Sequence, residues 1–181
     1  MHGARTCLPE AKTKSSQVCF DCARLLPETH RAFTESSMGS SASPAFSVRC
    51  YCGAVALDAS AAPRGIVNCH CGQCRRLSGA AFTTWVSFRS TSILITGNES
   101  LTAFPVTTNV TRHFCRVCGS HVFTSDIRLP KVLGVPAGVI AGAPLTTPSA
   151  HYFVSHKASW HAICDGLPRF GGESGVEPPA A

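Results

Sequence analysis

Seven cysteines gathered in three short clusters constrain the fold of this 181-residue chain more than any other feature of its sequence. The clusters are Cys50-Tyr51-Cys52-Gly53, Cys69-His70-Cys71-Gly72-Gln73-Cys74 and Cys115-Arg116-Val117-Cys118-Gly119. The chain holds 11 cysteines in all, an odd number that cannot pair completely within one chain, and it is longer than a small disulfide scaffold. The clustered thiols are therefore predicted to bind metal.

The spacing of the thiols predicts one closed zinc site. Cys115 and Cys118 form a C-x-x-C-G knuckle, and strand-like residues follow it in place of the helix that a redox C-x-x-C motif needs. Cys50 and Cys52 supply a second pair, which also ends in glycine. Closing the loop between the pairs costs about 4 kcal/mol, whereas a structural zinc contributes about 10–16 kcal/mol. We therefore predict a four-thiolate structural site of Cys50, Cys52, Cys115 and Cys118.

The remaining thiols, Cys69, Cys71 and Cys74, lie close enough in sequence to surround a second zinc. Three protein ligands leave one position open, which is the arrangement of catalytic zinc, and an open zinc binds and deprotonates an incoming thiol or water. We predict these three cysteines as catalytic ligands, giving two zinc ions per chain. The alternative is a second closed site that is completed by one of four other residues: His70, His113, His121 or Cys164.

The charge pattern favours a small anionic ligand over nucleic acid. The net charge is +6, and residues 46–171 hold eleven basic and four acidic side chains, but no basic run extends beyond Arg75-Arg76. Because this pair directly follows the second cluster, Arg75 and Arg76 are predicted to bind substrate carboxylates. The alternative is that one of them neutralises the thiolates or caps the turn.

Hydrophobic periodicity predicts a mainly β fold. Residues 82–88 alternate with period two, and further strands are expected over 93–95, 101–106, 110–114, 121–125 and 132–140. A single helical turn is expected over 73–78. Phe82, Thr83 and Trp85 could line a pocket or belong to the core, as aromatic side chains at strand spacing usually do.

The two ends of the chain differ from its middle. Residues 1–45 are predicted to be an extension, with a flexible Ser/Gly linker over 36–43 in which Met38 could be the true start. A third zinc site there would use the residues Cys7, Cys19, Cys22 and His30. Residues 46–171 form the predicted zinc domain, and 172–181 form a flexible tail. No signal peptide or membrane span is recognised, so we expect an intracellular, cytoplasmic protein without a membrane partner.

Four ordered motifs resemble a known family. They are C-x-C-G-A-V from Cys50, C-H-C-x-x-C-R-R-x-S-G-A-A-F-x-x-W from Cys69, R-x-F-C-x-x-C-G-S from Arg112, and W-x-x-x-x-D-G-L-P-x-F from Trp160. This pattern is similar to the glutathione-dependent formaldehyde-activating enzymes, whose domain centromere protein V shares. The match spans about residues 46–171, and it departs from the family at Val48 and Ser159, where the family often has glycine and proline.

The resemblance implies an Mss4-like (β-tent) fold of short coiled sheets pinned by zinc. It implies the same division of the seven cysteines into a structural and a catalytic site. It also implies a carbon–sulfur lyase that joins glutathione, or a related thiol, to formaldehyde. His70 and His113 are candidate proton shuttles, because imidazole titrates near neutral pH, and the alternative is that each is structural. The other function that the resemblance leaves open is a zinc-stabilised binding module without catalysis, of the centromere protein V type.

Overall fold

The computed structural model describes residues 46–141 and 147–178, which belong to one compact unit of the chain. The predicted extension with its linker, Met38 and the candidate third zinc site all lie outside these residues. Within the described ranges, no helix combines the length and the hydropathy that a membrane crossing needs.

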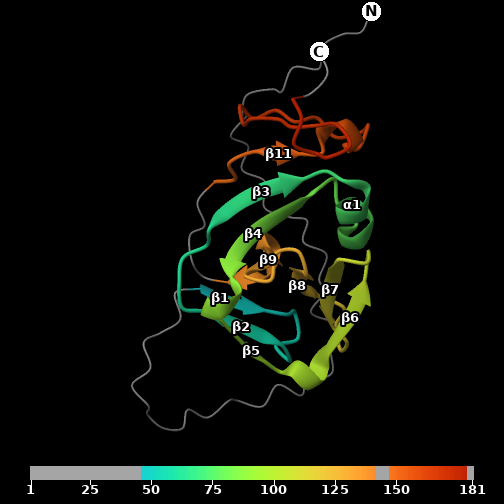
Figure 1. The fold of residues 1–181 in the computed structure, drawn as a ribbon. Coiled ribbons are helices and arrows are strands. Elements are labelled where there is room, and N and C mark those ends of the chain that lie inside the picture. The colour runs from blue at the N-terminus through green and yellow to red at the C-terminus, as the bar shows by residue number, and fades with distance from the viewer. Residues whose placement is uncertain (1–45, 142–146, 179–181) are drawn as a thin grey trace, which may run out of the picture. The chain divides into compact units, whose positions relative to one another are not determined.

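The described residues form two β-sheets (Figure 1). The smaller sheet has the strand order β10-β1-β2-β5, and the larger has the order β11-β3-β4-β9-β8-β7-β6. The strands of the smaller sheet are β1 (Phe46–Arg49), β2 (Ala56–Ala59), β5 (Ile93–Thr96) and β10 (Ile140–Ala141). Those of the larger sheet are β3 (Gly65–Cys69), β4 (Thr83–Arg89), β6 (Leu101–Pro105), β7 (Val110–Cys115), β8 (His121–Asp126), β9 (Val132–Pro136) and β11 (His151–Tyr152).

The core lies between the two sheets. Val48 and Leu57 from the smaller sheet and Val86 and Phe88 from the larger one are fully buried in a single apolar cluster. Burial of such side chains is the main favourable term in folding. Strand β4 shows how the period of two is used, because Val86 and Phe88 enter the core while Trp85 and Ser87 line a cavity on the opposite face.

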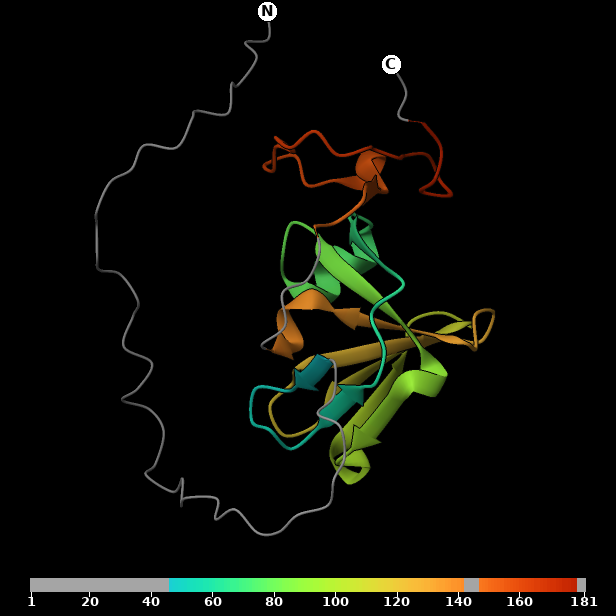
Figure 2. The same ribbon diagram turned by 90° about the vertical axis from the view of Figure 1, so that its left-hand side faces the viewer.

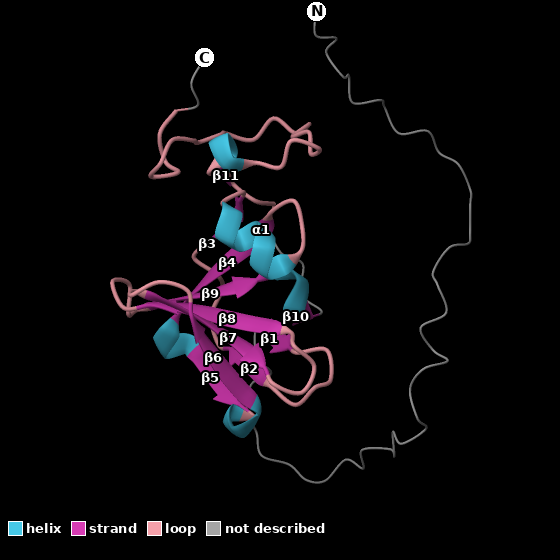
Figure 3. Ribbon diagram, turned by 90° about the vertical axis from the view of Figure 1, so that its right-hand side faces the viewer, coloured by secondary structure: helices cyan, strands magenta, loops and turns pink. Residues whose placement is uncertain are grey.

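The helical elements are short. The α-helix α1 (Gly72–Ser78) follows β3, as Figure 3 shows, and the 3-10 turns are η2 (Ser90–Ser92), η3 (Asn98–Ser100), η4 (Ala137–Val139) and η5 (Val154–His156). The Cys71 sulfur caps α1 by accepting a hydrogen bond from the Cys74 N–H, and Gly79 ends the helix in the left-handed conformation with φ +67°.

The last described segment, 147–178, crosses the end of the larger sheet beside α1 (Figure 2). Its strand β11 pairs in parallel with β3, so that His151 lies opposite Asn68 and Tyr152 opposite Cys69. The main-chain carbonyl of His156 accepts a 2.7 Å hydrogen bond from Arg75 Nη1. These contacts place residues from the end of the chain next to the second cysteine cluster.

The mainly β fold class predicted from the sequence is confirmed. The expected strand over 132–140 is interrupted, because β9 ends at Pro136, which has no N–H to continue the ladder, and η4 intervenes before β10. The expected helical turn over 73–78 is longer by one residue at its start, since Cys71 caps a helix that begins at Gly72.

Candidate metal centres and the cavities beside them

Two groups of thiols converge, and they are the two groups that the sequence predicted. The sulfurs of Cys50, Cys52, Cys115 and Cys118 all lie within 4.8 Å of one another. Those of Cys69, Cys71 and Cys74 form a second group on the same criterion. Among the described residues, no histidine and no further cysteine joins the second group, so the alternatives with His70, His113, His121 or Cys164 as a fourth ligand find no support within that distance.

The first cluster has the geometry that zinc requires. The Cys50 and Cys52 sulfurs are 3.6 Å apart, and the Cys52 and Cys115 sulfurs are 3.7 Å apart. A tetrahedron with Zn–S bonds of about 2.3 Å has edges of about 3.8 Å. Each cysteine pair is followed by a glycine with positive φ, +78° at Gly53 and +76° at Gly119, which confirms the predicted knuckle conformation. The two separations of 3.6 and 3.7 Å therefore suit a zinc ion held by these four thiols.

The second cluster is built at the junction of β3 and α1. Cys69 is the last residue of β3, Cys71 caps α1, and Cys74 lies buried in its first turn. The Cys69 thiol and then the Cys74 thiol donate hydrogen bonds that lower the pKa of Cys71 to about 2, while the hydrogen bond with Cys71 is the main cause that raises the pKa of Cys69. A cation is needed for all three to ionise together, so the donor set suits a metal.

Two donors from the larger sheet converge on one sulfur of this cluster. Trp85 Nε1 lies 3.4 Å and Arg112 Nη2 lies 3.6 Å from Cys74 Sγ. The Arg112 guanidinium also lies over the Trp85 ring, 4.5 Å from its centroid. Hydrogen bonds to a ligating sulfur orient it and stabilise its negative charge. Sequence reasoning missed Arg112, although it begins the R-x-F-C motif.

A buried chain of hydrogen bonds runs beside the same cluster. His70 Nε2 lies 2.8 Å from His151 Nδ1, and His151 Nε2 lies 3.0 Å from Asp165 Oδ2. Because a carboxylate only accepts, His151 donates at Nε2, accepts at Nδ1 from His70 Nε2, and leaves His70 Nδ1 unprotonated. Burial and then the nearby His151 lower the pKa of His70 to about 4. His151 gave no sequence signal, and Asp165 gave one only through the D-G-L-P motif.

The other histidine proposed as a shuttle lies in a different environment. His113 on β7 stacks on Phe123 with ring centroids 4.1 Å apart, and its Nε2 lies 3.1 Å from Ser125 Oγ. Phe82 packs against His70 and His161 with tilted rings, whose centroids are 5.0 and 5.3 Å away. Thr83 is buried, and its hydroxyl donates to the Cys74 carbonyl. Of the three predicted pocket residues, Trp85 is the one that lines a cavity described below.

The two arginines predicted to bind substrate have different surroundings. Arg75 is engaged with the His156 carbonyl, and its buried Nε has no partner among the described residues. Arg76 is exposed, and a Cβ added at Gly72 would lie 3.2 Å from its Nη1. Arg76 lines a cavity of about 380 Å³ together with Cys71, Gln73 and His156, and a second one of about 280 Å³ together with Arg75 and the exposed Trp160.

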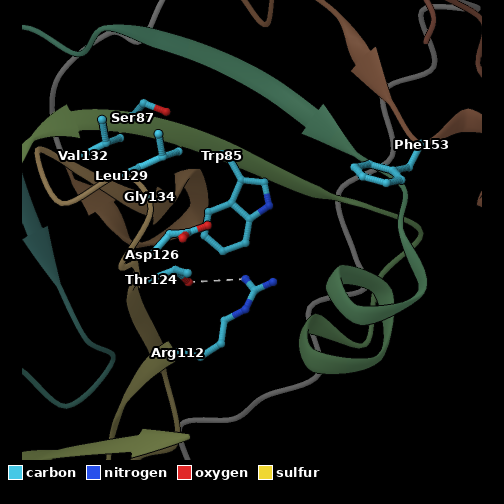
Figure 4. Close-up of a pocket in the computed structure, with 9 residues that line it drawn as sticks. All are labelled: Trp85, Ser87, Arg112, Thr124, Asp126, Leu129, Val132, Gly134 and Phe153. Atoms are coloured by element: carbon cyan, nitrogen blue, oxygen red, sulfur yellow. Dashed lines mark hydrogen bonds between the residues drawn. The ribbon is translucent and has the colours of Figure 1, made fainter. Parts of the chain in front are cut away.

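A further cavity of about 430 Å³ has the Trp85 and Arg112 side chains in its lining (Figure 4). Phe153 borders both this cavity and the one at Cys71. Phe153 is the one described residue other than glycine with positive φ, at 57°. Such a conformation is costly for an aromatic residue and is held by its surroundings.

Comparison with known proteins agrees with this geometry. The sequence model of the family described as glutathione-dependent formaldehyde-activating enzyme matches residues 45–156, more than half of the chain. The chain belongs to this family. The match takes in all seven clustered cysteines and ends before Asp165. None of the curated proteins searched matches the chain.

Among solved structures, the chain is similar to a Rhodobacter sphaeroides protein whose crystal structure was determined as a structural genomics target. The two sequences are 24% identical, and the superposition gives a TM-score of 0.46. It covers 54% of this chain and 90% of that one.

Proposed function

We propose that this member of the glutathione-dependent formaldehyde-activating family is a zinc-dependent carbon–sulfur lyase that acts on the adduct of a small thiol, such as glutathione, with an aldehyde. The observation that carries the proposal is the three-thiol cluster, which has no fourth protein ligand among the described residues and has Cys71 in the wall of a cavity. Zinc, when bound there, supplies a Lewis acid that favours the thiolate form of the substrate sulfur.

In the proposed division of roles, Cys50, Cys52, Cys115 and Cys118 hold a structural zinc, and Cys69, Cys71 and Cys74 hold the catalytic one. Trp85 and Arg112 donate to Cys74 and keep its sulfur oriented toward the metal position. The exposed Arg76 holds a carboxylate of the thiol substrate, while Arg75 supports the turn at His156 and lines the neighbouring cavity.

The reaction is balanced without a redox partner. In the adduct, one carbon carries both the hydroxyl and the thioether sulfur. When the carbon–sulfur bond breaks, its electron pair stays with sulfur, the hydroxyl oxygen becomes the carbonyl oxygen, and the hydroxyl proton ends on the released thiol. Synthesis of the adduct is the reverse. Because the thiolates must remain reduced, the proposal places the activity in the cytoplasm, with neither a membrane nor a nucleic acid as partner.

The first test is the zinc content per chain of the wild type and of Cys71→Ser. We expect two zinc ions to fall to one, with the circular dichroism spectrum retained and lyase turnover lost. One zinc ion in both proteins would contradict the proposal and favour a zinc-stabilised binding module of the centromere protein V type.

The second test concerns the arginines. Loss of a charge-assisted hydrogen bond costs about 1.5–3 kcal/mol, so Arg76→Ala should lower kcat/KM for the glutathione adduct by about 10- to 100-fold. Arg89→Ala removes an exposed arginine at the end of β4 and serves as the control. Equal kinetics for the two variants would remove Arg76 from the proposed site.

A further inference from the structure

Trp85 and Arg112, which contact the second cluster, also line a cavity to which the proposed binding of metal and thiol assigns no role. It measures about 430 Å³, and the two side chains that contact Cys74 Sγ form part of its wall. In Figure 4 the Trp85 indole and the Arg112 guanidinium stand between α1 and the side chains of Leu129 and Val132. A group in this cavity would therefore lie against the two side chains that contact the cluster.

The one guanidinium of the cavity, that of Arg112, contacts the Cys74 sulfur but is neutralised by no carboxylate among the described residues. Arg112 is 5% exposed and forms no ion pair among the described residues. Its Nη1 lies 3.4 Å from Thr124 Oγ1, and its buried Nε has no hydrogen-bond partner there. Asp126 also borders the cavity, but its carboxylate pairs with Arg128 through both oxygens. A buried guanidinium with an unused N–H favours a ligand that brings an oxygen acceptor.

Apart from Ser87, Thr124 and Asp126, the rest of the lining is apolar. Trp85, Leu129, Val132 and Phe153 contribute most of the wall, together with the bare backbone of Gly134. A cavity that admits one water-sized molecule, which formaldehyde nearly is, needs only about 10–15 Å³. This cavity is therefore far larger than a one-carbon aldehyde requires, and its walls suit a body of several apolar carbons.

We infer that the Trp85–Arg112 cavity binds the carbonyl half of the substrate, and that this half is an aldehyde with an apolar body of several carbons rather than formaldehyde. This inference rests on the proposed function. The thiol half would occupy the more polar cavity of Cys71 and Arg76, and Phe153 borders both halves. The aldehyde oxygen, or the hydroxyl of the adduct, would accept from Arg112. The carbon–sulfur bond then lies at the cluster, and it breaks with the balance given above.

Gly134 allows the cavity to be filled without touching the cluster. A Cβ at this position would lie 3.4 Å from Trp85 Cε3, an ordinary contact, and its φ is not positive. Gly134→Val therefore projects methyl groups against the Trp85 ring from strand β9, which tolerates a β-branched residue. Gly65→Val is the matched control, because Gly65 is also in a strand, is exposed and has nothing within 4 Å of an added Cβ.

The kinetic experiment compares two glutathione adducts, one with formaldehyde and one with isovaleraldehyde, on zinc-loaded protein. We expect the wild type to favour the isovaleraldehyde adduct by at least about tenfold in kcat/KM, since a few methylene groups in an apolar pocket give discrimination of that size. Gly134→Val should lower that value at least tenfold and change the formaldehyde value less than threefold. A wild type that prefers formaldehyde, or a Gly134→Val variant that affects both adducts equally, would overturn the inference.

A binding experiment separates this inference from the proposed lyase. Isovalerate, which contains no thiol and cannot react, is titrated into the zinc-loaded protein while the Trp85 indole N–H is followed by NMR, with Trp160→Phe to assign the signal. We expect saturable shifts that weaken at least tenfold in Gly134→Val and in the milder Gly134→Ala, but not in Gly65→Val. Absence of any shift overturns the site itself. Saturable shifts in a protein that turns over neither adduct support the apolar-anion site and count against the lyase.

Discussion

At the scale of single residues, the second cluster depends on side chains that come from distant parts of the chain. Cys69, Cys71 and Cys74 are local in sequence, but the donors to Cys74 come from β4 and β7, and the buried histidine chain ends at Asp165. Polar groups that are buried and fully partnered fix one geometry, and removing one member leaves another uncompensated. The individual contributions can therefore be tested by substitutions that leave the thiols in place.

The histidine chain predicts a definite tautomer. In the wild type, the ¹⁵N chemical shifts should identify His70 Nδ1 and His151 Nδ1 as unprotonated and both Nε2 atoms as protonated. Asp165→Ala removes the acceptor of His151 Nε2, so it should mix the tautomers and lower the free energy of unfolding by about 1–3 kcal/mol. A control is Glu173→Ala, which changes an exposed carboxylate in the same segment. Unchanged ¹⁵N chemical shifts of the two histidines in Asp165→Ala would contradict the hydrogen-bond chain from His70 to Asp165.

His121 predicts part of the acid sensitivity. Burial, and next the charge of Arg112, lower its pKa to about 4, whereas the unfolded chain titrates near 6.5. As the pH falls from about 6.5 to about 4, His121 is protonated in the unfolded chain but stays neutral in the folded one. This uptake of a proton stabilises the unfolded state, so His121 lowers the stability of the fold over that pH range. Because glutamine does not titrate, the unfolding free energy of His121→Gln should fall less steeply with decreasing pH than that of the wild type. The two slopes should differ by up to about 1.4 kcal/mol per pH unit. Urea titrations at pH 7, 6 and 5 measure both slopes, and parallel slopes would refute the assignment.

At the scale of elements, the turn between β5 and η3 supports the Cys50–Gly53 turn, which carries two thiols of the first cluster. Gly97 has φ +79°, and a Cβ there would lie 1.9 Å from the main-chain oxygen of Ala54, the residue after Gly53. Neither the conformation nor the space admits a side chain. The smaller sheet therefore holds the Cys50–Gly53 turn in place by direct backbone contact.

Gly97→Ala should consequently lower stability and loosen the first metal centre. The positive φ alone costs about 1–2 kcal/mol for a residue with a Cβ, and the contact with Ala54 adds to it, so we expect a loss of at least about 2 kcal/mol in urea unfolding. Zinc should also be released faster to a chelator. Gly138→Ala, at an exposed position with nothing within 4 Å of the new Cβ, is the control. Similar values for the two variants would show that Gly97 is not a support.

Much at the element scale could be predicted from the sequence, because it depends on local patterns. The alternation over 82–88 corresponds to β4, and the glycines after each cysteine pair correspond to the two left-handed turns. The parallel pairing of β11 with β3 could not be predicted, since two residues of strand carry no periodicity and the partners lie more than 80 positions apart. For that reason the sequence did not reveal His151, and Arg112 was visible only as one residue of a motif.

At the scale of the whole described unit, the two cysteine clusters connect different elements, so we expect the metals proposed to bind them to stabilise different parts of the fold. Cys50 and Cys52 follow β1 of the smaller sheet, whereas Cys115 ends β7 of the larger sheet and Cys118 lies in the turn after it, so a metal in the first cluster would join the two sheets. A metal in the second cluster would join β3 only to the helix that directly follows it. A structural zinc site contributes about 10–16 kcal/mol, as much as the net stability of about 5–15 kcal/mol of a typical domain. Loss of the first metal should therefore unfold the unit, and loss of the second should not.

Two matched substitutions test this difference in the full chain. Cys52 is exposed and Cys71 is half-buried, so neither change to serine places a new hydroxyl in the core. We expect Cys52→Ser to lose the cooperative urea transition or to shift it by more than about 4 kcal/mol, and Cys71→Ser to stay within about 2 kcal/mol of the wild type. Amide hydrogen exchange should lose protection in β1, β2, β7 and β8 of the first variant, whereas in the second the loss should be confined to α1 and the end of β3. Equal destabilisation by the two substitutions would mean that both centres hold the fold together, and the open cluster would then have to be regarded as a structural site.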